Sequence, residues 1–378
     1  MRKIDRNFLL QLVALVVFLI AMAAANRVPL GQAAAAVFFL AGFILGPGFL
    51  LSSLFRAQSS SVVTGVGCAV ICGLTAQVVT FFSFSFSGTY LCLFIPLLCY
   101  LLLLRQVTRE RARTFFEKLA DALGAMSATH FFCYIVAGLA YTFFVRTIPY
   151  RDVKSLGLDM HVLGAASQLV SLRYGFPMQF MTIAGDYAAI AYNSFGHMVG
   201  VLFTALFHSS ALLYVSKIHY IIFGSLTIIS SLVAIVSFIE KKFVAYAFFL
   251  VGCILIWNIY FVQMAAMPLF LLIVALFLNK NNTSWGLIVI SWCAFFVLFG
   301  ARFFASIPLL AGMTMSCVIT LLTHNERIVS LRHMAAAYSA TAVAYWLFVK
   351  FGIQSSQYTP LEVRFDHVPQ LFSDVRHA

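Results

Sequence analysis

Four polar side chains near the middle of the chain are of types that support acid–base or phosphate chemistry. Asp159 and His161 stand two residues apart, and Asp186 and His197 follow in the same stretch. A carboxylate can act as a general base on an acceptor hydroxyl, and an imidazole can orient a phosphate or make a local hydrogen bond. Asp159 is equally suited to cap the helical stretch that follows it, so both interpretations are kept.

A divalent cation is a second use for these side chains. Asp159, His161 and Asp186 together offer oxygen and nitrogen ligands of the kind that Mg²⁺ or Mn²⁺ accepts. The Asp-x-His spacing alone is a weak metal signal. The eight cysteines all fall inside apolar segments and form no zinc-type cluster. We therefore assign no metal ligand and keep Mg²⁺ or Mn²⁺ as an optional cofactor.

Long apolar stretches surround these residues. Of the 378 residues, 62% are hydrophobic and 10% are charged, which excludes an ordinary soluble domain. Most stretches are long enough to cross a hydrocarbon core of roughly 30 Å as helices. The sequence predicts an all-α, polytopic integral membrane protein with about eleven transmembrane helices. The expected spans are residues 8–25, 33–54, 61–82, 88–104, 124–145, 219–238, 244–258, 260–278, 285–303, 307–323 and 334–352.

The basic residues orient these helices. They gather at the ends of apolar stretches, which explains the net charge of +12 without nucleic acid. The basic start, 1–6, and the basic loop 105–118 are expected in the cytoplasm, and the tail 353–378 outside it. We expect an uncleaved first helix rather than a signal peptide, because its apolar core is long and more spans follow.

One apolar stretch, 193–215, is left out of the predicted spans. If it crossed the membrane, three successive basic loops would lie outside, against the positive-inside rule. Its polar residues also suit a lipid-exposed span poorly. We expect it to lie at the membrane surface or to dip into the membrane from the outside.

The whole chain, 1–378, is expected to form one membrane domain. Residues 1–123 supply four helices and the basic cytoplasmic loop, and 124–352 form a core around the outer loop 146–217. A loop of this length is usually functional or disordered. Its content of Tyr, Phe and small residues favours an ordered loop with surface helices.

Three short motifs follow one another in this outer loop: Asp159-x-His161, Gly175-x-Pro177 and Tyr192-x3-Gly196-His197. Their order, ahead of an apolar helix, resembles the first large extracytoplasmic loop of the GT-C superfamily, most closely its bacterial members. These are polytopic glycosyltransferases that use polyprenyl-phosphate-linked sugars. The resemblance covers residues 150–241. It departs from the family pattern at Asn193, where a Pro is usual, and in the four spans that precede the loop.

The resemblance implies a glycosyltransferase of the plasma membrane that serves polysaccharide biosynthesis in the cell envelope. Asp159 matches the family's acidic catalytic residue, and His161 and His197 match histidines that line its cavity. We therefore predict Asp159 and His161 as catalytic residues. The predicted substrate-binding residues can contact sugar or phosphate: Arg151, Arg173, Asp186, Tyr192, His197 and Arg302. Arg302 has a plainer role open to it, which is to extend its charge to the lipid headgroups.

The expected partners are a lipid-linked sugar donor, a glycan or lipid acceptor, and membrane lipids. A transporter or flippase for lipid-linked saccharides is an alternative. It is disfavoured because the chain has almost no ionisable residue deep in a span and no internal repeat. A polymerase of lipid-linked saccharides that depends on the loop arginines, and a membrane partner without enzymatic activity, also stay open.

Overall fold

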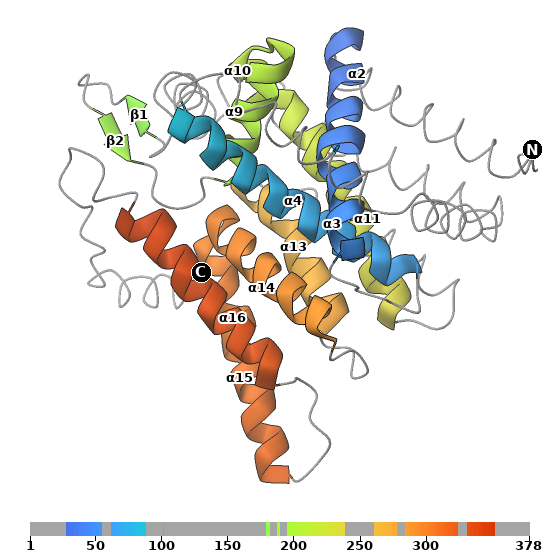
Figure 1. Cartoon of the computed structure of the whole chain (residues 1–378), viewed down its shortest axis with the longest axis vertical. Helices are drawn as coiled ribbons and strands as arrows, with labels where there is room; N and C mark the ends of the chain where they lie inside the picture. The colour runs from blue at the N-terminus through green and yellow to red at the C-terminus, as the bar shows by residue number, and fades with distance from the viewer. Residues whose placement is uncertain are drawn as a thin grey trace, which may run out of the picture.

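The computed structural model describes residues 28–54, 62–87, 101, 179–181, 187–189, 195–238, 261–277, 284–323 and 331–351. This part of the chain is helical except for one short hairpin (Figure 1). The elements are α2 (Leu30–Phe39), η1 (Leu40–Leu45), α3 (Gly46–Leu54), α4 (Val62–Ser87), β1 (Gln179–Met181), β2 (Tyr187–Ala189), α9 (Phe195–Phe207), α10 (Ala211–Leu213), η2 (Tyr214–Ile218), α11 (His219–Phe238), α13 (Phe261–Phe277), α14 (Trp285–Ala301), α15 (Phe303–Thr323), α16 (Leu331–Ala344) and η4 (Tyr345–Phe351).

The described helices coincide with the expected apolar segments. Every expected span that falls within these residues is helical. The first of them, 33–54, corresponds to α2, η1 and α3, and the last, 334–352, corresponds to α16 and η4. Two helices, Leu30–Ser52 and Gly65–Phe82, are long and apolar enough to cross a membrane. The segments 8–25, 88–104, 124–145 and 244–258 lie outside the described residues, Leu101 excepted.

The antiparallel pair of β1 and β2 lies within the outer loop 146–217, with Phe180 opposite Ala188. The residue content of this loop favours surface helices, so the strand pair is a difference. Each strand has only three residues. Strands this short carry too little alternation to be read from a sequence.

The first described helix is interrupted by a π-helical segment, η1. The N–H of Gly46 donates to the carbonyl of Ala41, five residues earlier. Pro47 follows and has no N–H, so it cannot serve the carbonyl of Phe43 four residues before it. Gln77 of α4 takes over this role, because its Nε2 donates to the Phe43 oxygen at 2.6 Å. A side chain of one helix thus satisfies the backbone of another.

Two glycines allow this helix to lie almost backbone to backbone on α4. A Cβ atom added at Gly48 would overlap the carbonyl oxygen of Ala69. One added at Gly73 would overlap the carbonyl oxygen of Ile44. Small residues permit the same close approach in helix pairs within membranes, where packing rather than water exclusion holds helices together.

The stretch 193–215 is two helical pieces rather than one. α9 ends just before His208, whose φ of 49° lies in the left-handed region. Ser210 then caps the next helix, since its hydroxyl accepts the N–H of Leu213 at 3.5 Å. The polar residues that make this stretch a poor span are therefore in part a turn.

After this turn the chain runs back along α9. The ring centroids of Phe203 and Tyr214 are 5.7 Å apart, and those of Phe195 and Phe223 are 6.0 Å apart. The first turn of α9 is consequently level with the middle of the helical run from α10 to α11. α9 has 13 residues, so it is only about 20 Å long.

α9 is buried rather than peripheral, and this corrects the expectation that 193–215 lies on a surface. Its residues from Phe195 to Ala205 are buried. They pack against α2, α4, η2, α13 and α14. His197 is one of the polar residues that suit a lipid-exposed span poorly. It is 6% exposed because other helices cover it. The other alternative, that this stretch dips into the membrane from the outside, is compatible with this burial.

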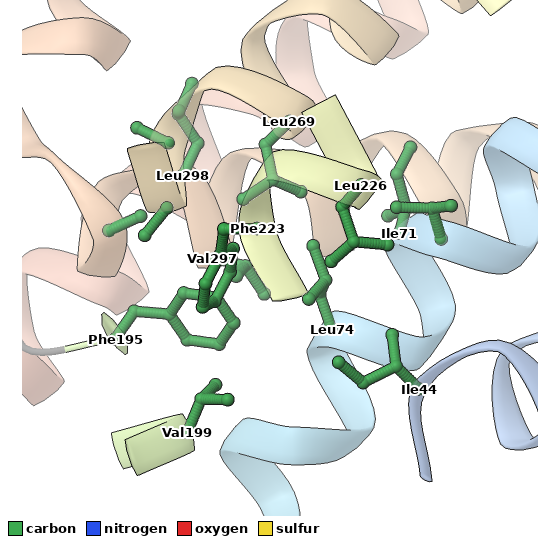
Figure 2. Packing of buried hydrophobic residues seen from close by; sticks show 14 of the residues in the cluster. Ile44, Ile71, Leu74, Phe195, Val199, Phe223, Leu226, Leu269, Val297 and Leu298 are labelled. Carbon is green, nitrogen blue, oxygen red and sulfur yellow. The ribbon is translucent and has the colours of Figure 1, made fainter. Parts of the chain in front are cut away.

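The core lies where these helices converge. Figure 2 shows apolar side chains from η1, α4, α9, α11, α13 and α14 gathered around one centre. They include Ile44, Ile71, Leu74, Phe195, Val199, Phe223, Leu226, Leu269, Val297 and Leu298. α4 crosses the front of this group in Figure 1 and touches α9, α11, α13 and α14. Dense contact of this kind supplies the dispersion energy of the bundle.

α14 and α16 run in the same direction. α15, which lies between them in the sequence, runs in the opposite direction. At one end the Arg332 guanidinium lies over the Trp285 ring, 5.7 Å from its centroid. At the other end Phe299 and Tyr345 meet edge to face, 6.4 Å apart. Thr314 of α15 is hydrogen-bonded to Tyr338 of α16 at 2.6 Å. The three helices therefore traverse the same layer in alternating directions.

The close approach of η1 to α4 predicts different effects at two glycines of one helix. Gly73→Ala should lower stability by about 1–3 kcal/mol, because a methyl group there forces the two backbones apart. Gly65→Ala is the matched control, since nothing lies within 4 Å of a Cβ at that position. It should leave stability unchanged or slightly higher. The measurement is the thermal unfolding midpoint of the purified protein in detergent. Equal midpoints for both variants would contradict the close contact.

Candidate functional site

Most of the predicted site residues fall outside the part of the chain that the structure describes. This is so for the predicted catalytic residues, Asp159 and His161. It is also so for four predicted substrate-binding residues, Arg151, Arg173, Asp186 and Tyr192. His197 and Arg302 are the predicted site residues that lie within described elements.

His197 stands in the first turn of α9, two residues from its start. The helix begins at Phe195, whose ring packs on Phe223 of α11. α9 also touches α14. The start of α9 is thereby fixed against two other helices, and His197 is held in a buried position.

Arg302 is the single non-helical residue between α14 and α15. Its backbone is extended, with φ −159° and ψ 102°, and its N–H donates to the Leu298 carbonyl at 2.8 Å. Its side chain is half-buried. A guanidinium at this position is suited to contact a phosphate or a sugar hydroxyl.

A buried hydrogen-bonded group next to His197 is absent from the sequence-based predictions. The Tyr214 hydroxyl donates to the carbonyl of Gly196 at 3.4 Å and lies 3.4 Å from Nδ1 of His219. Both rings are 0% exposed. A phenol has one hydrogen, which the Gly196 contact uses. The second contact therefore requires His219 to carry a proton on Nδ1 and to donate to the Tyr214 oxygen.

This group ties the first turn of α9 to η2 and α11. Gly196 precedes His197 directly, so the hydroxyl of Tyr214 acts on the backbone that positions His197. The rings of Tyr214 and His219 also pack edge to face, with centroids 5.7 Å apart. In the sequence, the available signal is a Tyr and a His five residues apart in an otherwise apolar run. That signal does not reveal their partner on α9.

Other buried polar groups divide into two kinds. Ser225 and Thr227 donate to carbonyls of their own helix, at 2.6 and 2.7 Å. The hydroxyls of Thr204, Ser230 and Ser291 are buried without a hydrogen-bond partner in the described structure. Each of the three stands on a different helix of the core, α9, α11 or α14. Unsatisfied hydroxyls in such a setting cost stability.

The described cysteines give no metal site. Cys68 and Cys72 are buried on one face of α4, 0% and 2% exposed, and are free thiols. Among the described residues, no group of three His, Cys, Asp or Glu side chains is placed to hold a metal ion. The two thiols are therefore packing residues of α4.

The chain matches no protein-family model, no curated protein and no solved structure. The resemblance of its outer loop to GT-C glycosyltransferases therefore stays a prediction from motifs.

Removing the Tyr214 hydroxyl should loosen the start of α9. Tyr214→Phe leaves the Nδ1–H of His219 without its phenolic acceptor, which should cost about 1–3 kcal/mol. Hydrogen exchange in peptides covering 195–205 should become faster. Tyr338→Phe is the control, because it removes a tyrosine hydroxyl that bonds Thr314 on an exposed face. It should leave exchange in 195–205 unchanged, and equal acceleration in both variants would contradict the assignment.

Proposed function

We propose that this chain is a polytopic glycosyltransferase of GT-C type in the plasma membrane. It transfers a sugar from a polyprenyl-phosphate donor to a glycan or lipid acceptor on the extracytoplasmic side. The observation that carries the proposal is the order Asp159-x-His161, Gly175-x-Pro177 and Tyr192-x3-Gly196-His197 ahead of an apolar helix. The fixed position of His197 in the first turn of α9 supports it.

The proposed reaction is an inverting displacement. Asp159 removes the proton of the acceptor hydroxyl, and the oxygen attacks the anomeric carbon from the face opposite the phosphate. The bond between this carbon and the phosphate oxygen breaks, and polyprenyl phosphate leaves with the electron pair. Arg151, Arg173 and Arg302 offset the charge of the departing phosphate. His161 and His197 hold the donor. A divalent cation such as Mg²⁺ would supply further charge for the phosphate.

The proposed topology has about eleven spans, a cytoplasmic N-terminus and an extracytoplasmic C-terminal tail. The length of α9 supports a re-entrant rather than a crossing arrangement, because about 20 Å of helix does not cross a core of roughly 30 Å. The first turn of a re-entrant helix lies within the hydrocarbon layer. Its unpaired N–H groups are tolerated there only when protein or water covers them. The burial of α9 by α4, α13 and α14 meets this condition.

Loss of the proposed base should abolish sugar transfer. Purified protein is assayed with polyprenyl-phosphate sugars, and Asp159→Asn should lower the rate by about 10²–10⁴-fold. Asp152→Asn is the control, because it removes a carboxylate of the same loop that has no assigned role. Full activity of Asp159→Asn would show that another residue is the base. Movement of a lipid-linked saccharide across vesicles without any transfer would favour the transporter alternative.

The re-entrant arrangement predicts the sides of two positions. Arg173→Cys should react with a membrane-impermeant maleimide from outside the cell, and Lys241→Cys only after the membrane is opened. The native cysteines lie inside apolar segments, which the reagent does not reach. Reaction of both positions from the same side would mean that the α9 stretch crosses the membrane, and the proposed number of spans would be wrong.

A further inference from the structure

The short π-helical segment η2 brings the side chains of Tyr214 and His219 together. The backbone N–H of His219 donates to the carbonyl of Tyr214, five residues earlier, which is the bond of a π-helix. In an α-helix, with about 3.6 residues per turn, side chains five residues apart point about 140° away from each other. The wider winding of η2 therefore allows the two side chains to meet. π-Helical turns are rare and occur frequently at functional sites.

His219 reaches the first turn of α9 through hydrogen bonds. Its Nδ1 donates to the hydroxyl oxygen of Tyr214 at 3.4 Å, and this hydroxyl donates to the carbonyl of Gly196 at 3.4 Å. The direction of the first bond follows from the single hydrogen of the phenol. A chain of this kind has one arrangement in which both bonds form, so it fixes the Gly196 carbonyl relative to η2.

A second route from His219 to the same turn is made of packed rings. The His219 ring lies on Phe223 of α11 with centroids 4.6 Å apart, and Phe223 meets Phe195 edge to face at 6.0 Å. The two routes end on Phe195 and Gly196, the two residues directly before His197. His219 is thereby connected twice to the turn in which His197 stands.

Burial shows why the type of side chain at this position matters. The His219 ring is 0% exposed, like the rings of Tyr214 and Phe223. A buried imidazole costs free energy that an apolar ring of similar size does not. Packing alone therefore does not account for a histidine here. A directional bond that selects one arrangement of the start of α9 does account for it.

We propose that His219 is a positioning residue for His197, and that η2 is wound as a π-helix to bring it into place. His219 acts through Tyr214 and Phe223 rather than on the substrate. The proposal rests on the proposed function in one respect, which is that His197 holds the sugar donor. Misplacement of a contacting group by about 1 Å can slow a reaction about 10²-fold, so a change at His219 is expected to affect transfer.

A double-mutant cycle of sugar transfer tests the proposal. His219→Phe keeps a ring against Phe223 but removes the hydrogen-bonded route, and it should lower kcat/KM by about 10- to 100-fold. In a His197→Ala chain the same substitution should change kcat/KM by less than about twofold, because the group that it positions is gone. A loss by the same factor in both chains is the result of a purely structural role, and it would overturn the proposal.

Two matched variants separate the hydrogen bond from a general effect on α11. The amide nitrogen of Asn can take the place of Nδ1 and donate to Tyr214, so His219→Asn should lose much less activity than His219→Phe. Ser225→Ala removes a buried hydroxyl of the same helix that bonds the Ile221 carbonyl, and it should leave kcat/KM unchanged. A loss in Ser225→Ala as large as that in His219→Phe would also overturn the proposal.

Nuclear magnetic resonance separates this proposal from the proposed function. The full chain in phosphatidylcholine vesicles carries isotope-labelled histidine nitrogens, and the two signals are identified by their loss in His197→Ala and His219→Phe. His219 should carry its proton on Nδ1, and His219→Phe should shift the His197 signal, whereas Ser225→Ala should not. These results from a chain that transfers no sugar would support the positioning role and reject the proposed function alone. A proton on Nε2 only, or an unmoved His197 signal in His219→Phe, would overturn the positioning role.

Discussion

The contact between the η1–α3 helix and α4 is the constraint on which the described bundle depends. Gly48 and Gly73 let the two backbones meet where any side chain would collide with a carbonyl. Gln77 then bonds the Phe43 carbonyl, which Pro47 leaves without its helical partner. α4 held in this way is the surface against which α9, α11, α13 and α14 pack. A shift of α4 would therefore be transmitted to every helix of the core.

The positions of the helices could be predicted from the sequence, and their pairing could not. Apolar runs bounded by polar or charged residues mark 219–238 and 285–303 almost to the residue, because helix length and hydropathy are local properties. The π-helical segment η1 depends on tertiary contact, because Gln77 of α4 bonds its Phe43 carbonyl. The parallel pairing of α14 with α16 depends on contacts such as Phe348 over Gly300. Local patterns do not contain this information.

The candidate site also has features that the sequence can indicate and features that depend on tertiary contact. Motif order makes His197 a candidate, and its role stays a prediction. The charge pattern placed its helix at the membrane surface or dipping into the membrane, and the structure buries it among other helices. Arg302 could be located at a helix end from the apolar run before it. The pair of Tyr214 and His219 could not be found, because its partner Gly196 lies across a turn that the apolar pattern conceals. His208 marks that turn with a positive φ, and non-glycine residues with positive φ are rarely evident from sequence.

The parallel pairing of α14 and α16 has a consequence for the order of assembly. α14 is complete at Ala301, yet its main partner begins only at Leu331, after all of α15 has been made. Until then Gly300 has no Phe348 ring against it, and Phe299 has no Tyr345. During synthesis the face of α14 that α16 later covers must therefore meet temporary neighbours, while α4 and α13 are already available to its other faces. The last three helices of the described chain reach their final packing together rather than one at a time.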